Sequence, residues 1–83
     1  MLKYRKGNFL EEAKRMDHKR VISRLREILW KKGMSIKDLS QQSGIGEVTL
    51  YRRFEGMSFF RADEIWKIAE ALGIEDIEFI FFS

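Results

Sequence analysis

The sequence predicts an all-α domain, a compact bundle of about five helices, and three observations support this prediction. Apolar residues recur at helical spacing along most of the 83 residues. The chain contains no proline that could interrupt these patterns, and glycines stand where the predicted helices end. The length suits one domain with a modest core, and a chain that is 45% hydrophobic and 35% charged is globular rather than disordered.

The chain divides into an N-terminal extension, residues 1–17, and the domain proper, residues 18–83. In the extension, Asn8 and Glu11 have the spacing of a capping box and predict a short helix that ends near residue 16. The domain begins with a long amphipathic helix that ends near residue 32 and is capped by Asp17. The apolar stripe of this helix is formed by Val21, Ile22, Leu25, Ile28 and Leu29.

The stretch from residue 35 to residue 56 predicts two short helices joined by a glycine turn, which is the layout of a helix-turn-helix (HTH) motif. Ser35 and Asp38 have the spacing of a capping box at the start of the first helix. The glycines of residues 44–46 supply the turn. The second helix is expected over residues 47–54.

Two further helices are predicted after this pair. The first covers Ala62 to Leu72, because acidic residues stand in its first turn and Gly73 follows its last. The second is expected within Ile74 to Ser83, where several apolar residues have helical spacing. The aromatic residues at this end suit a place in the core and a dimer seam equally well, and they are Phe79, Phe81 and Phe82.

The two tryptophans occupy different positions on their predicted helices. Trp66 flanks the apolar face of its helix, so we expect it to be partly buried. Trp30 lies opposite the apolar stripe of the long helix. We expect one of the terminal segments to cover Trp30, and the alternative is exposure in a partner interface.

Several short motifs occur together between about residue 21 and residue 82. They are Met34-Ser35, Leu39-Ser40, Gly44-Ile45, Thr49-Leu50, Phe54-Glu55-Gly56, Asp63-Glu64-Ile65 and the run Lys67-Ile68-Ala69-Glu70-Ala71-Leu72-Gly73. With these motifs the chain resembles the HTH repressors of the Cro and lambda-repressor (XRE) type, especially the small versions from phages and mobile elements of Gram-positive bacteria. The resemblance implies a lambda-repressor-like fold that binds double-stranded DNA.

Two departures from this family pattern, and one acidic residue next to the second of them, bear on contacts with DNA. Ile36 stands where the family often has a glutamine that touches a phosphate. Gly46 replaces the usual polar cap of the second helix, so a side chain that could bond DNA is missing. Glu47 is either a reader of cytosine or, as we favour, an acid that stabilises the first turn of its helix.

A helical wheel of the second helix separates a core face from a face that could enter the major groove. Leu50 and Phe54, four residues apart, are expected to point inward. Arg52 lies on the opposite face and is the best candidate for base reading, because its guanidinium matches the acceptors of guanine. Val48 could contact a thymine methyl group. The complete set of predicted DNA-binding residues is Gly46, Glu47, Val48, Thr49, Tyr51, Arg52 and Arg53.

The charge distribution indicates where DNA phosphates would be attracted. Residues 1–33 carry 11 basic and 4 acidic residues, whereas residues 34–83 carry 5 basic and 9 acidic residues. Such asymmetry also arises from solvated helix faces, so alone it identifies no partner. The predicted phosphate contacts are Ser35 at the start of the HTH pair and, on the long helix, Arg20, Arg24 and Lys31.

Composition argues against several other classes of protein. The chain has no cysteine and a single histidine, His18, so neither a common metal site nor a catalytic constellation can be assembled. We therefore expect no enzyme activity, metal, cofactor or small-molecule substrate. The longest apolar run is short and the N-terminus is charged, so we expect no membrane span and a cytoplasmic location.

The predicted function is that of a sequence-specific DNA-binding transcriptional regulator, a phage-type repressor that acts as a homodimer. The alternative is an HTH scaffold that serves as a protein-interaction module, such as an antitoxin or an antirepressor partner. Ile36, Gly46 and Glu47 favour the alternative, since they remove or oppose phosphate contacts. Arg52, Arg53 and the basic first third favour DNA binding.

Overall fold

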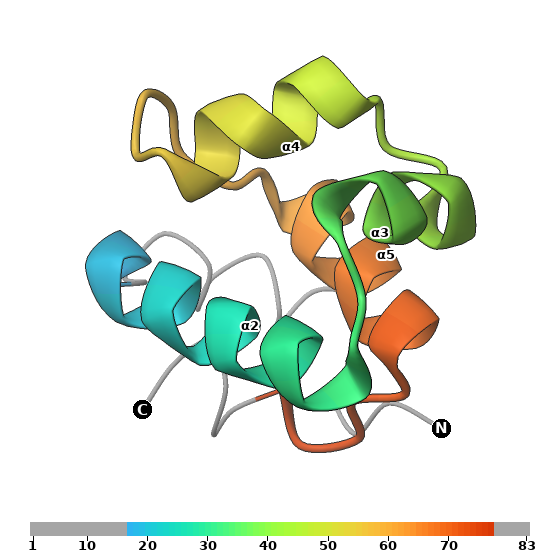
Figure 1. Cartoon of the computed structure of the whole chain (residues 1–83). Helices are drawn as coiled ribbons and strands as arrows, with labels where there is room; N and C mark the ends of the chain where they lie inside the picture. The colour runs from blue at the N-terminus through green and yellow to red at the C-terminus, as the bar shows by residue number, and fades with distance from the viewer. Residues whose placement is uncertain (1–16, 78–83) are drawn as a thin grey trace.

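The computed structural model describes residues 17–77, and this part of the chain contains four helices and no strand (Figure 1). The all-α class is confirmed. The helix predicted in the N-terminal extension and the three terminal phenylalanines lie outside the described residues. The helices are α2 (His18–Lys32), α3 (Ile36–Ser43), α4 (Glu47–Phe54) and α5 (Ala62–Leu72).

Helix α2 begins and ends where the sequence predicts. The side chain of Asp17 accepts a hydrogen bond from the backbone N–H of Arg20 at 3.3 Å, so it caps the helix start. At the other end, Gly33 adopts the left-handed conformation with φ 67°, which a side chain would disfavour. The buried residues of α2 are Val21, Leu25 and Leu29.

Helix α3 is closed at both ends by its own residues. Ser35 and Asp38 form the predicted capping box, in which each side chain accepts a hydrogen bond from the other residue's backbone N–H, at 2.9 and 3.0 Å. In the turn that follows, the Ser40 hydroxyl donates to the carbonyl of Ile45 at 2.6 Å, and Ser43 Oγ accepts from the Ile45 N–H at 3.2 Å. The turn into α4 is therefore held by side chains of α3.

Helix α5 closes the described domain. The carboxylate of Glu64 accepts from the backbone N–H of Arg61 at 2.9 Å and caps the start of α5. After the helix, the Ile74 N–H donates back to the Ala69 carbonyl at 2.9 Å. Residues 74–76 are not helical, whereas Ile77 is. The helix expected within Ile74 to Ser83 therefore begins no earlier than Ile77, and the rest of its range lies outside the described residues.

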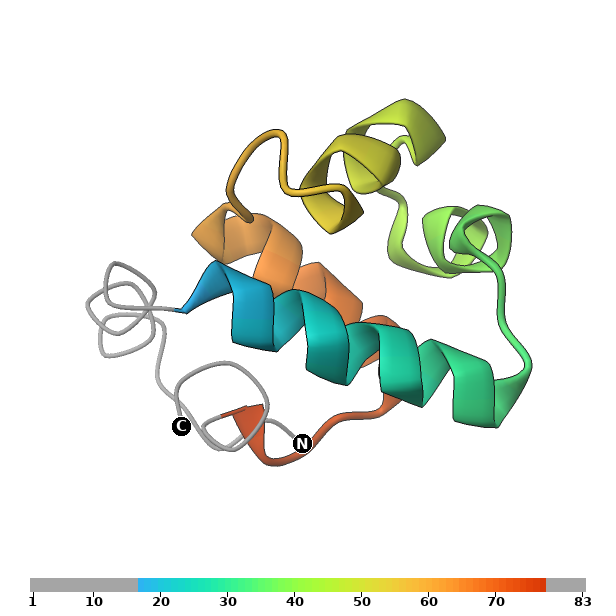
Figure 2. The same cartoon turned by 60° about the vertical axis from the view of Figure 1, so that its left-hand side comes forward.

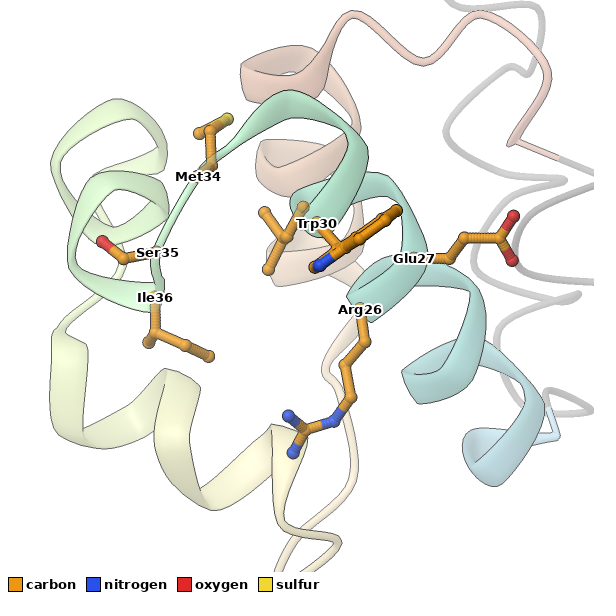
Figure 3. Close-up of a pocket in the computed structure, with 7 residues that line it drawn as sticks. Arg26, Glu27, Trp30, Met34, Ser35 and Ile36 are labelled. Atoms are coloured by element: carbon orange, nitrogen blue, oxygen red, sulfur yellow. The ribbon is translucent and has the colours of Figure 1, made fainter.

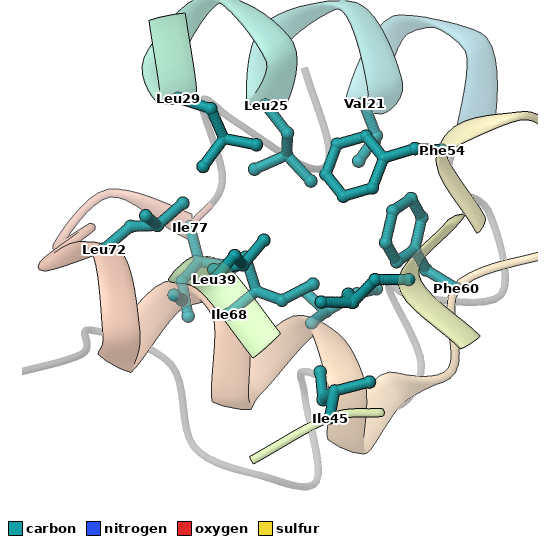
Figure 4. Close-up of a cluster of buried hydrophobic side chains, with 13 residues drawn as sticks. Val21, Leu25, Leu29, Leu39, Ile45, Phe54, Phe60, Ile68, Leu72 and Ile77 are labelled. Carbon is teal, nitrogen blue, oxygen red and sulfur yellow. The ribbon is translucent and has the colours of Figure 1, made fainter. Parts of the chain in front are cut away.

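The core lies between α2 and the other three helices. Figures 1 and 2 show α2 alongside α5, and α4 at the edge of the molecule with no other helix on its outer side. Leu50 and Phe54 are 0% and 2% exposed, so the predicted inward face of α4 is confirmed. In Figure 4 the α2 side chains face those of the other elements across the core. The remaining buried hydrophobic residues from outside α2 are Leu39, Ile45, Phe60, Ile65, Ile68, Ala69, Leu72 and Ile77.

The two tryptophans differ in burial. Trp66 is partly buried against the core, as predicted. Trp30 is 83% exposed, and the terminal segments that we expected to cover it lie outside the described residues. The side chain of Trp30 points away from the buried stripe of α2. The helical pattern predicts this direction, but it does not predict which other segment packs over the side chain.

Candidate nucleic-acid interface

The outer face of α4 carries most of the residues that the sequence predicts for DNA reading. Val48 and Tyr51 are 68% and 52% exposed, which is high for large apolar side chains. Glu47 and Arg52 are also exposed, and Thr49 is half-buried. Because Leu50 and Phe54 anchor the opposite side, this face presents a mixture of one guanidinium, one carboxylate and apolar surface to solvent.

Arg53 does not share this face. Its guanidinium donates from Nε to Glu64 Oε1 at 2.8 Å and from Nη2 to Oε2 at 2.9 Å, and Nη1 also donates to the hydroxyl of Ser58. The Arg53 and Glu64 side chains are only 14% and 9% exposed. The hydrogen bonds to Glu64 raise the pKa of Arg53 above its usual value, although burial opposes this shift. The guanidinium of Arg53, one of the predicted DNA contacts, is therefore engaged in an ion pair inside the domain.

Arg26 is a second cation that holds α4, and the sequence patterns did not identify it. Its Nη2 donates to the Phe54 carbonyl at 3.0 Å and to Glu55 Oε2 at 3.1 Å. The guanidinium also lies over the Phe54 ring, 5.6 Å from its centroid. Arg26 thus satisfies a carbonyl at the end of α4 from α2. No local signal could have revealed this, since Arg26 and Glu55 are 29 residues apart.

The start of α3 is the second predicted contact with DNA. Ser35 is exposed, and its Oγ already accepts from the Asp38 N–H. The hydrogen bond from the Ser35 N–H lowers the pKa of Asp38, so this carboxylate stays ionised at the helix start. Ile36, which stands where the family has glutamine, is half-buried and cannot donate to a phosphate. The side-chain donors at this corner are the Ser35 hydroxyl and the ammonium group of Lys37, which is exposed in the first turn of α3.

A surface groove of about 500 Å³ adjoins the start of α3 (Figure 3). Figure 3 shows Trp30 and Ile36 at its sides, while the Arg26 side chain extends toward α4. The lining residues are Arg26, Glu27, Leu29, Trp30, Met34, Ser35 and Ile36. Since most of these side chains are apolar or already engaged in ion pairs, the groove offers little charge to a phosphate.

The predicted phosphate contacts of α2 are already engaged in interactions within the protein. Lys31 Nζ lies 3.0 Å from Glu27 Oε1, one turn earlier in the helix, and both side chains are well exposed. Arg20 and Arg24 each have an interaction partner as well. An exposed pair of this kind is worth little, so Lys31 can exchange Glu27 for a phosphate at small cost.

The loop between α4 and α5 is apolar at its surface. Met57 and Phe59 are 74% and 70% exposed. The Phe59 ring stacks on His18 with centroids 4.2 Å apart, and this joins the loop to the start of α2. Burial lowers the pKa of His18 against the opposing charge of Asp17, and the buried Nδ1 has no hydrogen-bond partner among the described residues. His18 therefore favours its neutral form in the folded protein.

Comparison with known proteins identifies the domain. The family model of the Cro/C1-type HTH DNA-binding domain matches residues 24–78. The chain belongs to this family. Helices α3 and α4 are thus the two helices of a Cro/C1-type HTH pair, and the chain carries the DNA-binding domain of a regulator. No match was found among curated proteins or among solved structures.

The described residues 17–77 contain no group of three or more His, Cys, Asp or Glu side chains that could hold a metal ion. None of their helices combines the length and the apolar character that crossing a membrane requires.

Proposed function

We propose that this Cro/C1-type domain is a sequence-specific transcriptional regulator, a phage-type repressor that reads the major groove with α4. The observation that carries the proposal is the outer face of α4, where Arg52, Val48 and Tyr51 are exposed on a helix whose other side is fully buried. A helix of this kind, at the edge of the domain, has the shape that a major groove accepts.

Each residue of this face has its own chemistry toward base edges. Arg52 would bond O6 and N7 of guanine, and Val48 would contact a thymine methyl group. Tyr51 and Thr49 offer hydroxyl groups to phosphates or bases. Gly46 leaves the first backbone N–H groups of α4 uncovered, and Glu47 serves chiefly the helix start. The preferred half-site would therefore contain a guanine, read by Arg52, close to a thymine contacted by Val48.

A single short helix reads few base pairs, so we infer a homodimer. Two copies would contact half-sites about one helical turn apart, or ~34 Å. Phosphate contacts from Ser35, Arg20, Arg24 and Lys31 would set the register of each copy on the duplex. The function requires no cofactor, catalysis or membrane contact, and its DNA target lies in the cytoplasm.

A protein-interaction module, such as an antitoxin or an antirepressor partner, is the second candidate, and two observations favour it. Arg53 is withdrawn from the exposed face into an ion pair. In addition, Met57 and Phe59 expose apolar surface in the loop directly after α4, where basic side chains would bind DNA phosphates more strongly. Such a module would bind a protein partner through α4 and the loop that follows it.

Selection of bound sequences from a random DNA pool tests the proposal. A repressor of this kind enriches one motif, and Arg52→Ala then costs about 1–3 kcal/mol against that motif and relaxes the choice at one base position. Lys67→Ala, a change of an exposed lysine on α5, serves as the matched control and leaves the affinity unchanged. A pool that yields no motif contradicts DNA reading and supports the interaction module.

A further inference from the structure

The ion pair between Arg53 and Glu64 joins the last turn of α4 to the first turn of α5. Both oxygens of the carboxylate take part, at 2.8 Å from Arg53 Nε and 2.9 Å from Nη2. A two-point contact between a planar guanidinium and a planar carboxylate fixes orientation as well as distance. The pair therefore limits how α4 can rotate relative to α5.

The same two side chains fix the loop between these helices. Glu64 Oε1 also accepts from the backbone N–H of Arg61 at 2.9 Å, and Arg53 Nη1 donates to the Ser58 hydroxyl. The carboxylate thus determines where α5 begins, while the guanidinium determines where the loop passes. Three segments meet at one pair of side chains.

Stability alone is a weak reason for such a pair. Moving two charges out of water costs several kcal/mol for each ion, and their attraction only roughly offsets this cost. Apolar side chains of similar volume at buried ion pairs often give equal or greater stability. What apolar side chains lack is direction, because burial of apolar surface favours many packings about equally.

The other contacts of α4 restrain its rotation less. Leu50 and Phe54 hold the helix through apolar packing. Arg26 adds an ion pair with Glu55, which is weak because the two side chains are 52% and 61% exposed. Arg26 also donates one hydrogen bond to the Phe54 carbonyl at 3.0 Å, but a contact to one backbone atom at the helix end fixes rotation less than a two-point contact between side chains does. Arg53 directly follows Arg52, so a fixed angle of about 100° around the helix axis separates their side chains. Holding Arg53 against α5 consequently sets the direction in which Arg52 points.

We propose that Arg53 and Glu64 are positioning residues for DNA reading: their pair sets the rotation of α4 so that Arg52 and Val48 meet the base edges. This inference rests on the proposed function. Glu64 is 7% exposed and belongs to α5, so it acts through Arg53 without touching DNA.

The double variant Arg53→Met/Glu64→Leu separates positioning from stability. It removes both charges together and leaves no unpaired ion in the site, so its unfolding midpoint should stay close to that of the wild type. The ratio of its affinities for the selected site and for scrambled DNA should fall about tenfold, the worth of one base contact. The slope of binding against salt should not change, because no phosphate contact is lost.

A matched control comes from the exposed pair at the same end of α5. Arg61 Nε lies 3.4 Å from Asp63 Oδ1, and these side chains are 70% and 54% exposed. Arg61→Gln/Asp63→Asn should leave the affinity ratio as it is in the wild type. If the double variant of the buried pair cannot be refolded, Arg53→Lys takes its place, since it keeps the charge and loses the two-point contact.

Two binding results would overturn the inference. A folded double variant that discriminates as well as the wild type would make the pair structural only. Weaker binding to all sequences, with a salt slope lower by about one, would instead make Arg53 a phosphate contact. If the wild type itself shows no preference for any sequence, the proposed function fails, and this outcome is visible before any variant is compared.

Residual dipolar couplings of backbone N–H groups test the rotation without DNA. In the wild type, the couplings of α3, α4 and α5 should fit one common alignment. In the double variant, the couplings of α4 should depart from the alignment that still fits α3 and α5. An unchanged fit for α4 would overturn the positioning role even if DNA binding is confirmed.

Discussion

Helices α3 and α4 have the same length, eight residues each, yet they are held in place in different ways. The start of α3 is closed by its own capping box of Ser35 and Asp38. Helix α4 begins at Gly46 without a side-chain cap, and its far end is held by Arg26 from α2 and by Glu64 from α5. The first helix of the pair is thus defined locally, whereas the second depends on distant elements.

This difference suits the role of each helix. A locally capped α3 provides a rigid support, and its serines also hold the turn that follows. The anchors of α4 lie on its inner side and at its end, which leaves its outer face open for the contact with DNA that we propose. The experiments below alter one kind of restraint at a time.

Loss of the apolar anchor of α4 should have the largest effect. Leu50→Asp would bury a carboxylate without a partner at a position that is 0% exposed, so the domain should be unfolded at neutral pH. Tyr51→Asp, next to it on the outer face, is the control and should leave the domain folded. Thermal unfolding followed by circular dichroism measures both, and a midpoint within a few degrees of the wild type for Leu50→Asp would contradict the assigned inward face.

Loss of the local cap of α3 should have a moderate effect. Ser35→Ala leaves the Asp38 N–H without its acceptor, and we expect a loss of about 1 kcal/mol in the free energy of unfolding. Gln41→Ala, at an exposed position later in α3, should change it by much less. Urea titration gives both values; equal values would show that the cap is dispensable.

The same comparison explains what the sequence could and could not predict. The start of α3 was predictable because the two residues of its capping box, Ser35 and Asp38, are three positions apart in the sequence. The inward face of α4 was predictable because Leu50 and Phe54 are four residues apart on one helix. The ion pair of Arg53 was not predictable, because its flanking position on the helix fits either side and its partner Glu64 lies 11 residues later. The exposure of Trp30 likewise depends on neighbours that no local pattern specifies.

A pH-dependent effect is expected where α2 meets the loop after α4. Burial lowers the pKa of His18 in the folded state, so as the pH falls His18 becomes protonated in the unfolded chain at a higher pH than in the folded protein. Stability should therefore fall as the pH drops through the ordinary histidine value of 6.5. His18→Phe preserves a ring to stack on Phe59 and should remove this part of the pH dependence between about pH 7 and 5. Urea titrations at several pH values would refute the assignment if both proteins respond alike.

Addition of a cap to α4 should have the smallest effect. Gly46 has φ −57°, and a Cβ there would meet Thr49 Oγ1 at 3.8 Å, an ordinary contact. Gly46→Ser should therefore fit, and we expect a gain of only a few tenths of a kcal/mol in the free energy of unfolding. A clear loss would show that this turn needs glycine for a reason other than space.

The unequal burial of the two tryptophans makes them separate fluorescent reporters. Trp66 packs against the core, so its emission should shift to longer wavelength when the domain unfolds. Trp30 is 83% exposed beside the groove at the start of α3, so unfolding should alter its emission little, whereas a molecule that covers the groove should shift it to shorter wavelength. In a Trp30→Phe variant the remaining tryptophan fluorescence would report on folding alone. In a Trp66→Phe variant it would report on whether the groove is occupied.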